Sequence, residues 1–379
     1  MLPGVGLLHE LGPGPYTGDV SARVPTSSDQ PAPRVTAPSL RAESEAVYAA
    51  LSAGALGAVY GLVAAMVWPS LPLSGTHWAF GGAAAIGAAV VAGAASGTGY
   101  WRARGRPGQQ WRQSLSAWEF TVNTISVVIV HVALAALAVL VVFLVLSRGF
   151  LGLRVDTFWA VVLMAASLGL TGYLVYLSVS RMDTQRMSSL LMVFITTGTL
   201  TAMVTTPDPQ WWKVHFSELG TFDALSSVVF NGTLIAGGLL VTTFGVYLGN
   251  DMQLLVSHRR LRNPRSPRLV TTLFVVMGIM LAGVGLVPVD VNLIVHNLSA
   301  SGMAVMYLVL LISGPRFLRG MPRTYFVSSW AFLIALVATV VLFVFGYFSL
   351  TALEIIAFAL IFGWIAVFIR FLGVTGQRE

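Results

Sequence analysis

Ten long apolar segments constrain the fold of this chain more than any other feature. A helix needs about 20 predominantly apolar residues to cross the hydrocarbon core of a bilayer, and each segment is long enough to span. Hydrophobic residues make up 56% of the sequence and charged residues 10%. We therefore predict an all-α polytopic membrane protein with about ten transmembrane helices. The expected spans are Ala46–Trp68, Trp78–Tyr100, Phe120–Leu146, Thr157–Ser180, Ser188–Val204, Ala224–Leu248, Leu269–Val287, Leu293–Ile312, Tyr325–Phe348 and Ala352–Leu372.

The basic residues predict the orientation of these spans. If the N-terminus is cytoplasmic, 19 of the 22 lysines and arginines fall in the tails or in cytoplasmic loops, and only Arg148, Arg154 and Lys213 fall outside. Because cytoplasmic loops are enriched in basic residues, we expect both termini in the cytoplasm of a cell, with the chain in its inner or plasma membrane. The same loops account for the net charge of +7, so we expect no nucleic-acid partner.

Composition separates the ten spans from a tail at each end. Residues 1–45 are rich in Pro, Ser, Gly and Ala and are expected to form a disordered cytoplasmic tail without a signal peptide. Residues 374–379 are expected to form a second cytoplasmic tail. The chain has no cysteine, which excludes disulfides and thiolate sites.

Polar residues gather in the stretch PDPQWWKVHFSELG, residues 207–220, on the expected outer side. Its paired tryptophans are typical of interfacial anchors. Two stripes of polar side chains enter the membrane from the same side at helical spacing: Asp223, Ser227 and Asn231, and Asn292, His296 and Ser299. Because polar groups are costly against lipid, both stripes should face the bundle interior or a wet cavity.

Each of these polar groups also has a plain structural interpretation. Asp223 and Asp290 precede helical segments and could be N-caps. Asn231 and Asn292 could hydrogen-bond between helices, and His296 could be a satisfied packing histidine. The argument for a functional His296 is that it pairs with Asn292 one turn earlier.

Three further residues could act at or within the membrane. Glu354 and Glu119 each close a Thr/Ser-x-x-Glu pattern, which favours capping boxes over a functional role. His131 lies near mid-membrane, where a proton relay and a neutral histidine bonded to a neighbouring helix are the two alternatives.

Catalytic patterns are weak in this sequence. A metal site would need His215, His296 and one of the carboxylates Asp223, Glu218 or Asp290, and no tight ligand spacing supports it, so we predict no metal. A Ser217–His215 nucleophile pair lacks a G-x-S-x-G elbow, and paired-carboxylate hydrolysis would require Glu218 near Asp223 or Asp290. The glycine-rich segments FGGAAAIGAAVVAGAASG and LIAGGLL are helix-packing faces, not nucleotide motifs, and no cofactor is expected.

Three short motifs give the second half of the chain a family resemblance. They are HFSELG from His215, FNGTLIAGG from Phe230 and VPVDVNLIVHN from Val287. In order and placement, residues from about 187 to 373 resemble the Frag/DRAM/Sfk-like six-helix membrane proteins, specifically their uncharacterised bacterial relatives with a domain of unknown function. The resemblance implies that residues 187–373 form a six-helix membrane domain and that residues 46–186 are an added four-helix N-terminal membrane module. It also implies an association with lipids, and the matching positions are Ser217, Glu218, Gly220, Asn231, Asp290, His296 and Asn297.

The sequence thus predicts a lipid or amphiphile in an outward-facing polar pocket, for transfer or regulation. The candidate pocket residues are His215, Ser217, Glu218, Asp223, Asn231, Asp290, Asn292, His296 and Asn297. Two alternatives stay open: a membrane-embedded lipid hydrolase or acyltransferase at the outer leaflet, and a non-catalytic subunit that docks a membrane-protein partner. The expected partners are membrane lipids, with a small amphiphile as ligand.

Overall fold

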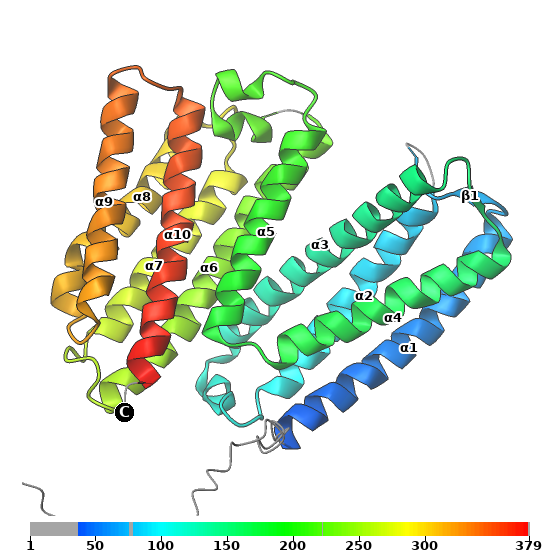
Figure 1. Ribbon diagram of the computed structural model, residues 1–379, viewed down its shortest axis with the longest axis horizontal. Helices are drawn as coiled ribbons and strands as arrows, with labels where there is room; N and C mark the ends of the chain where they lie inside the picture. The colour runs from blue at the N-terminus through cyan, green and yellow to red at the C-terminus, as the bar shows by residue number, and fades with distance from the viewer. Residues whose placement is uncertain (1–36, 76–78, 222, 378–379) are drawn as a thin grey trace, which may run out of the picture. The chain divides into compact units, whose positions relative to one another are not determined.

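The computed structural model describes residues 37–75, 79–221 and 223–377 (Figure 1). Within these residues, ten helices are long and apolar enough to cross a membrane, which confirms the predicted all-α polytopic class. Residues 1–36 of the predicted disordered tail lie outside the described residues. The helices are α1 Ala37–Val67, α2 Phe80–Ala103, α3 Ala117–Gly149, α4 Thr157–Ser180, α5 Thr184–Thr205, α6 Leu225–Ser257, α7 Ser266–Leu286, α8 Leu293–Phe317, α9 Arg323–Val344 and α10 Leu350–Gln377.

Short elements occupy four of the described connections. The strands β1 (Leu71–Pro72) and β2 (Arg154–Val155) pair antiparallel and join the α1–α2 connection to the α3–α4 connection. The 3₁₀ helix η1 (Gln110–Ser114) lies between α2 and α3, and the 3₁₀ helices η2 (Trp211–Lys213) and η3 (Phe216–Gly220) lie between α5 and α6.

Small residues let α1 and α4 pack with their backbones in contact. A Cβ added at Gly57 of α1 would lie 2.7 Å from the carbonyl oxygen of Met164 in α4, and one at Gly172 of α4 would lie 2.9 Å from that of Ala49. Helix α2 packs against both α3 and α4. The glycine- and alanine-rich sequence of these helices therefore serves close packing, as the sequence predicts.

Helix α1 begins earlier than expected, and part of the predicted tail is helical. Residues 40–45, assigned to a disordered tail by composition, form the first turns of the described helix. Glu43 forms an ion pair of 2.8 Å with Arg181, and Glu45 pairs with Arg106 and accepts a 2.6 Å hydrogen bond from Tyr176. These charge-assisted contacts order a segment whose composition alone favours disorder.

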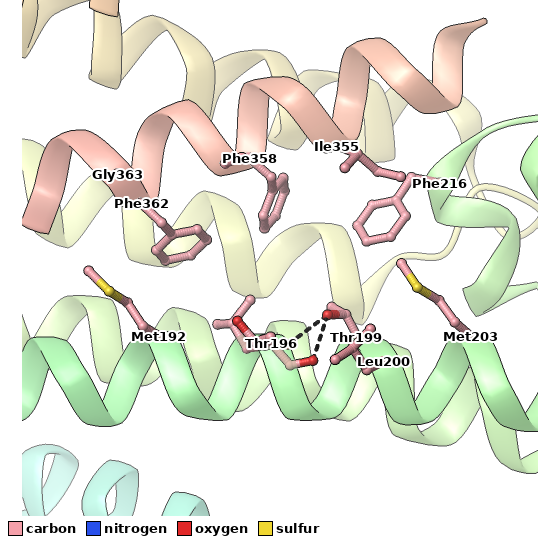
Figure 2. Close-up of a pocket in the computed structure, with 12 residues that line it drawn as sticks. Met192, Thr196, Thr199, Leu200, Met203, Phe216, Ile355, Phe358, Phe362 and Gly363 are labelled. Atoms are coloured by element: carbon pink, nitrogen blue, oxygen red, sulfur yellow. Dashed lines mark hydrogen bonds between the residues drawn. The ribbon is translucent and has the colours of Figure 1, made fainter.

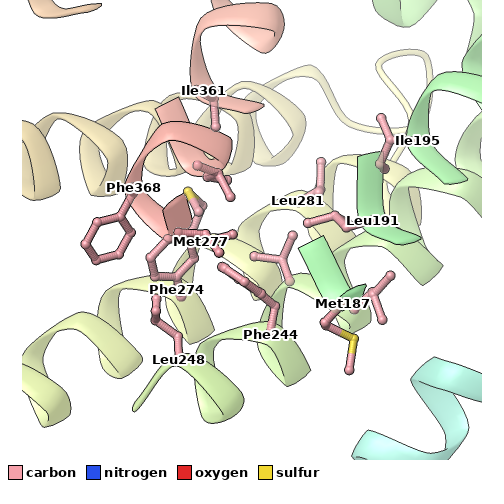
Figure 3. Packing of buried hydrophobic residues seen from close by; sticks show 14 of the residues in the cluster. Met187, Leu191, Ile195, Phe244, Leu248, Phe274, Met277, Leu281, Ile361 and Phe368 are labelled. Carbon is pink, nitrogen blue, oxygen red and sulfur yellow. The ribbon is translucent and has the colours of Figure 1, made fainter. Parts of the chain in front are cut away.

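Helices α6 and α7 pack with their backbones in contact. A Cβ at Gly238, within the LIAGGLL segment, would lie 2.4 Å from the carbonyl oxygen of Gly278. Around this contact, aromatic and aliphatic side chains of α5, α6, α7 and α10 fill the core (Figure 3). Phe244 and Phe274 meet edge to face there, with ring centroids 5.2 Å apart.

Two buried polar residues tie α3 and η1 to their neighbours. His131 of α3 bonds through Nδ1 to the carbonyl of Val127 at 2.7 Å and through Nε2 to Oγ of Ser178 in α4 at 3.0 Å. This is the helix-to-helix bond that the sequence offered as the alternative to a proton relay. Arg112 is buried, lies over the rings of Tyr100 and Tyr247, and donates to the carbonyl of Met182 at 3.1 Å.

Candidate functional site

The segment that carries HFSELG lies over one end of α6, α8 and α10, which we call the η3 end (Figure 1). The 3₁₀ helix η3 contacts both α6 and α10. Phe216 and Leu219 of η3 are buried, and Phe216 packs edge to face against Phe230 at 5.2 Å. These apolar contacts hold the polar members of the same segment in place.

His296 is the buried centre of the polar cluster at the η3 end. It lies in the first turns of α8, is 4% exposed, and accepts or donates on both ring nitrogens. Nδ1 lies 2.9 Å from the carbonyl oxygen of Val287, and Nε2 lies 3.1 Å from Oγ of Ser217. Because a carbonyl oxygen can only accept, the neutral imidazole carries its proton on Nδ1. Nε2 is then the acceptor for the hydroxyl of Ser217.

Glu354 connects α10 to the start of η3. Its Oε2 accepts a 2.5 Å hydrogen bond from the backbone N–H of Phe216. The capping box predicted for Glu354 is therefore wrong, because the carboxylate serves a segment distant in sequence and not the first turn of its own helix. The matching prediction for Glu119 is confirmed: Ser116 and Glu119 form a reciprocal capping box at the start of α3.

His215 and Glu218 form a second pair within the same segment. His215 Nε2 lies 3.4 Å from Glu218 Oε2, and both side chains are about one-fifth exposed. Nδ1 of His215 is buried and has no hydrogen-bond partner among the described residues. The hydrogen-bonding capacity of this pair is therefore not fully used by the described residues.

Asn231 of α6 fixes the end of η3. Its Nδ2 donates to the carbonyl oxygen of Gly220 at 2.9 Å. A Cβ at Gly220 would lie 2.5 Å from Oδ1 of Asn231, so a larger residue there would displace the Asn231 side chain. The prediction that Asn231 hydrogen-bonds between segments agrees with this geometry.

The structure does not bring the other four predicted residues into the cluster. Asp223, Asp290 and Asn297 are exposed, and Asn292 accepts from Val295 N at 3.1 Å as the N-cap of α8. The capping roles predicted for Asp223 and Asp290 are wrong: Ala224 is the N-cap of α6, and Asn292 is that of α8. His296 bonds to Ser217 and Val287 through its side chain, and not to the Asn292 side chain as proposed.

A small apolar cavity of about 130 Å³ lies directly below the polar cluster. Ser217 and Glu354 are its polar lining residues, and the remaining lining side chains are apolar residues of α6, α7, α8 and α10 together with Phe216. Since Ser217 and Glu354 both line the cavity, a molecule within it would meet a polar end and an apolar interior.

A larger apolar groove of about 320 Å³ runs between α5 and α10 (Figure 2). Figure 2 shows Met192, Thr196 and Met203 of α5 opposite Phe358 and Phe362 of α10, with Phe216 at one end. Phe216 and Phe358 line both this groove and the small cavity, and their ring centroids lie 6.0 Å apart. Two aromatic rings therefore separate the two hollows.

Sequence reasoning missed the residues that build the groove, although a signal for them exists. Met192, Thr196, Thr199 and Met203 recur at helical spacing on one face of α5. The contribution of Phe358 and Glu354 has no such local signal, because it depends on how α10 packs against η3. Among the described residues, no three His, Cys, Asp or Glu side chains are close enough together to hold a metal ion.

The fold and the site define a multi-pass membrane protein with a polar cluster above two apolar hollows. Residues 188–370, which run from α5 to α10, match a family model described as "Protein of unknown function (DUF998)". The expected limits, residues 187–373, agree closely with this match, whereas no comparison supports the Frag/DRAM/Sfk-like name. No curated protein and no solved structure matches the chain.

Proposed function

We propose that this protein binds a lipid or related amphiphile at the η3 end, with an acyl chain in the α5–α10 groove and the headgroup at the polar cluster. The observation that carries the proposal is the shared wall of Phe216 and Phe358, which lines the groove on one side and, on the other, the cavity that Ser217 and Glu354 also line. An amphiphile has this same division into an apolar chain and a polar end.

The sizes of the binding free-energy contributions indicate which part of the ligand determines selectivity. Transfer of one methylene from water to an apolar site is worth about 0.8 kcal/mol, but a lipid chain in a bilayer is already in hydrocarbon. The groove therefore selects the ligand by its shape and adds little net affinity. Headgroup hydrogen bonds must supply the selectivity, at about 0.5–1.5 kcal/mol each.

The cluster favours an uncharged, hydrogen-bonding headgroup. Glu218 and Glu354 would repel an anionic headgroup, and Nδ1 of His215 has no hydrogen-bond partner among the described residues. A diacylglycerol or a neutral glycolipid fits this chemistry. By the distribution of basic residues, the η3 end faces away from the cytoplasm and the ligand comes from the outer leaflet of the cell membrane.

Lipids retained by the gently purified protein test this proposal. Thr196→Trp places a large side chain in the groove, whereas Val193→Trp adds the same side chain to an exposed position of α5 that does not line it. Mass spectrometry should find a neutral lipid at near-stoichiometric level with the wild type and Val193→Trp, and a several-fold loss with Thr196→Trp. Equal retention by all three proteins would refute binding in the groove.

A further inference from the structure

We propose that Ser217 and His296 are a nucleophile and its general base, and that they hydrolyse an acyl ester of the bound amphiphile. The inference rests on the proposed function, because the two hollows would hold the acyl chain whose ester carbonyl reaches Ser217. It assigns a reaction to the site that amphiphile binding alone does not require.

The hydrogen bonds of His296 prepare Nε2 to accept a proton. The carbonyl of Val287 holds Nδ1–H at 2.9 Å, which leaves the lone pair of Nε2 directed at Ser217 Oγ, 3.1 Å away. A serine activated in this way needs its base within about 2.6–3.2 Å and a third group that orients the base. Here a backbone carbonyl orients the base, which is the role of the carboxylate in a Ser-His-Asp triad.

Glu354 is a positioning residue for Ser217. Its carboxylate holds the N–H of Phe216, the residue that precedes the serine, and it borders the same cavity. Asn231 holds Gly220 at the other end of η3. The serine is thus on a short segment fixed at both ends, although no G-x-S-x-G elbow is present.

A second serine–histidine pair in the chain shows what makes the first one different. His131 bonds to the carbonyl of Val127 and to Ser178 in the same pattern, with Nε2 to Oγ at 3.0 Å. Ser178 lines neither of the two hollows, whereas Ser217 lines the cavity below η3. The hydrogen bond between His131 and Ser178 is therefore structural. The bond between His296 and Ser217 lies beside a cavity, and this cavity points to a catalytic role.

The reaction uses water as its only co-reactant. Ser217 Oγ attacks the ester carbonyl carbon while Nε2 takes the hydroxyl proton, and the carbonyl π electrons move to its oxygen. When the carbonyl re-forms, the bond to the alcohol oxygen breaks and that oxygen takes the proton from Nε2. Water then attacks the acyl-serine and gives a proton to Nε2, Oγ leaves with that proton, and the products are a carboxylic acid and an alcohol.

An alkyl fluorophosphonate tests the nucleophile directly, because an activated serine displaces fluoride and keeps the phosphoryl group. The full-length protein in detergent micelles should be labelled, and mass spectrometry of the labelled peptide should place the adduct on Ser217. Ser217→Ala and His296→Ala should abolish labelling, and Ser178→Ala, which breaks the matched pair, should leave it unchanged. Absence of an adduct on Ser217 in the wild type would overturn the inference whether or not the variants fold.

Hydrolysis of 4-nitrophenyl decanoate gives a second readout. General-base catalysis is worth about 10²–10⁴-fold, so each single variant should lose at least about 100-fold in rate. Because the two groups act as a unit, Ser217→Ala/His296→Ala should be no slower than either single variant. Wild-type hydrolysis unaffected by Ser217→Ala would refute the assignment.

The retained lipid separates this inference from the proposed function. If the wild type retains lipid but Ser217 is not labelled, the reaction is wrong and amphiphile binding stands. If Ser217 is labelled but neither wild type nor Ser217→Ala retains lipid, the nucleophile stands and amphiphile binding is wrong. The account in full predicts labelling of the wild type together with intact ester lipid enriched in Ser217→Ala.

Discussion

Glu354 Oε2 accepts a 2.5 Å hydrogen bond from the backbone N–H of Phe216, although 138 residues separate the two in sequence. This bond joins the start of η3 to α10 and places Ser217 beside the cavity. This carboxylate therefore holds the polar cluster in place together with the Asn231–Gly220 bond at the other end of η3.

Glu354→Ala should loosen η3 without unfolding the helices. With its acceptor removed, the Phe216 amide should exchange with deuterium at least about tenfold faster, which corresponds to a loss of about 1.4 kcal/mol in local opening. Glu354→Gln keeps an acceptor oxygen and should be intermediate. Hydrogen exchange read on peptides from 211–220 checks this, and an unchanged rate in Glu354→Ala would contradict the role assigned to the bond.

Two glycines of α6 should respond to the same substitution with opposite signs. Gly238→Ala places a Cβ 2.4 Å from the carbonyl oxygen of Gly278, and backbone cannot give way cheaply, so we expect a loss of about 1–3 kcal/mol. Gly232→Ala meets nothing within 4 Å and should gain about 0.5–1 kcal/mol from helix propensity. Thermal unfolding in detergent measures both, and equal effects would refute the close α6–α7 contact.

The ion pair of Glu45 should stabilise the docking of α1. The side chains of Arg106 and Glu45 are 14% and 18% exposed, so replacement of Arg106 by Ala leaves a mostly buried carboxylate and should cost about 1–3 kcal/mol. Arg41 contacts the same carboxylate from a side chain that is 80% exposed, and Arg41→Ala should cost less than about 1 kcal/mol. Limited proteolysis and thermal unfolding distinguish these outcomes, and similar losses would contradict the role given to Arg106.

The sequence predicts the helices well because their signal is local. Span length and apolar content locate all ten, and α4 begins and ends at the expected residues, Thr157 and Ser180. The sequence places the start of α1 too late, because Glu43 and Glu45 form ion pairs with residues that are remote in sequence. Composition records only that such residues are charged.

The candidate site was predictable in part. The motifs brought forward Ser217, Asn231 and His296, but their pairing depends on the packing of α6 and α8 under η3. Ser217 was therefore matched with its sequence neighbour His215, whereas its partner is His296, 79 residues away. The local sequence pattern at Glu354 predicts a capping box, but the carboxylate instead accepts the hydrogen bond from Phe216.

The absence of native cysteine allows a clean test of orientation. A cysteine at Val214, which is 50% exposed beside η3, should react with a membrane-impermeant maleimide in intact cells. A cysteine at Pro264, in the exposed connection between α6 and α7, should react only after the membrane is opened. The reverse pattern would place the η3 end in the cytoplasm and refute the outer-leaflet origin of the ligand.

A photoactivatable lipid tests the central claim most directly. A diacylglycerol with a diazirine in one acyl chain, reconstituted with the wild-type protein and irradiated, should crosslink to peptides that contain 192–203 of α5 and 355–363 of α10. Thr196→Trp should reduce these crosslinks several-fold, and Val193→Trp should not. Crosslinks spread over the exposed faces of α3 and α9, and unchanged by Thr196→Trp, would contradict amphiphile binding in the groove.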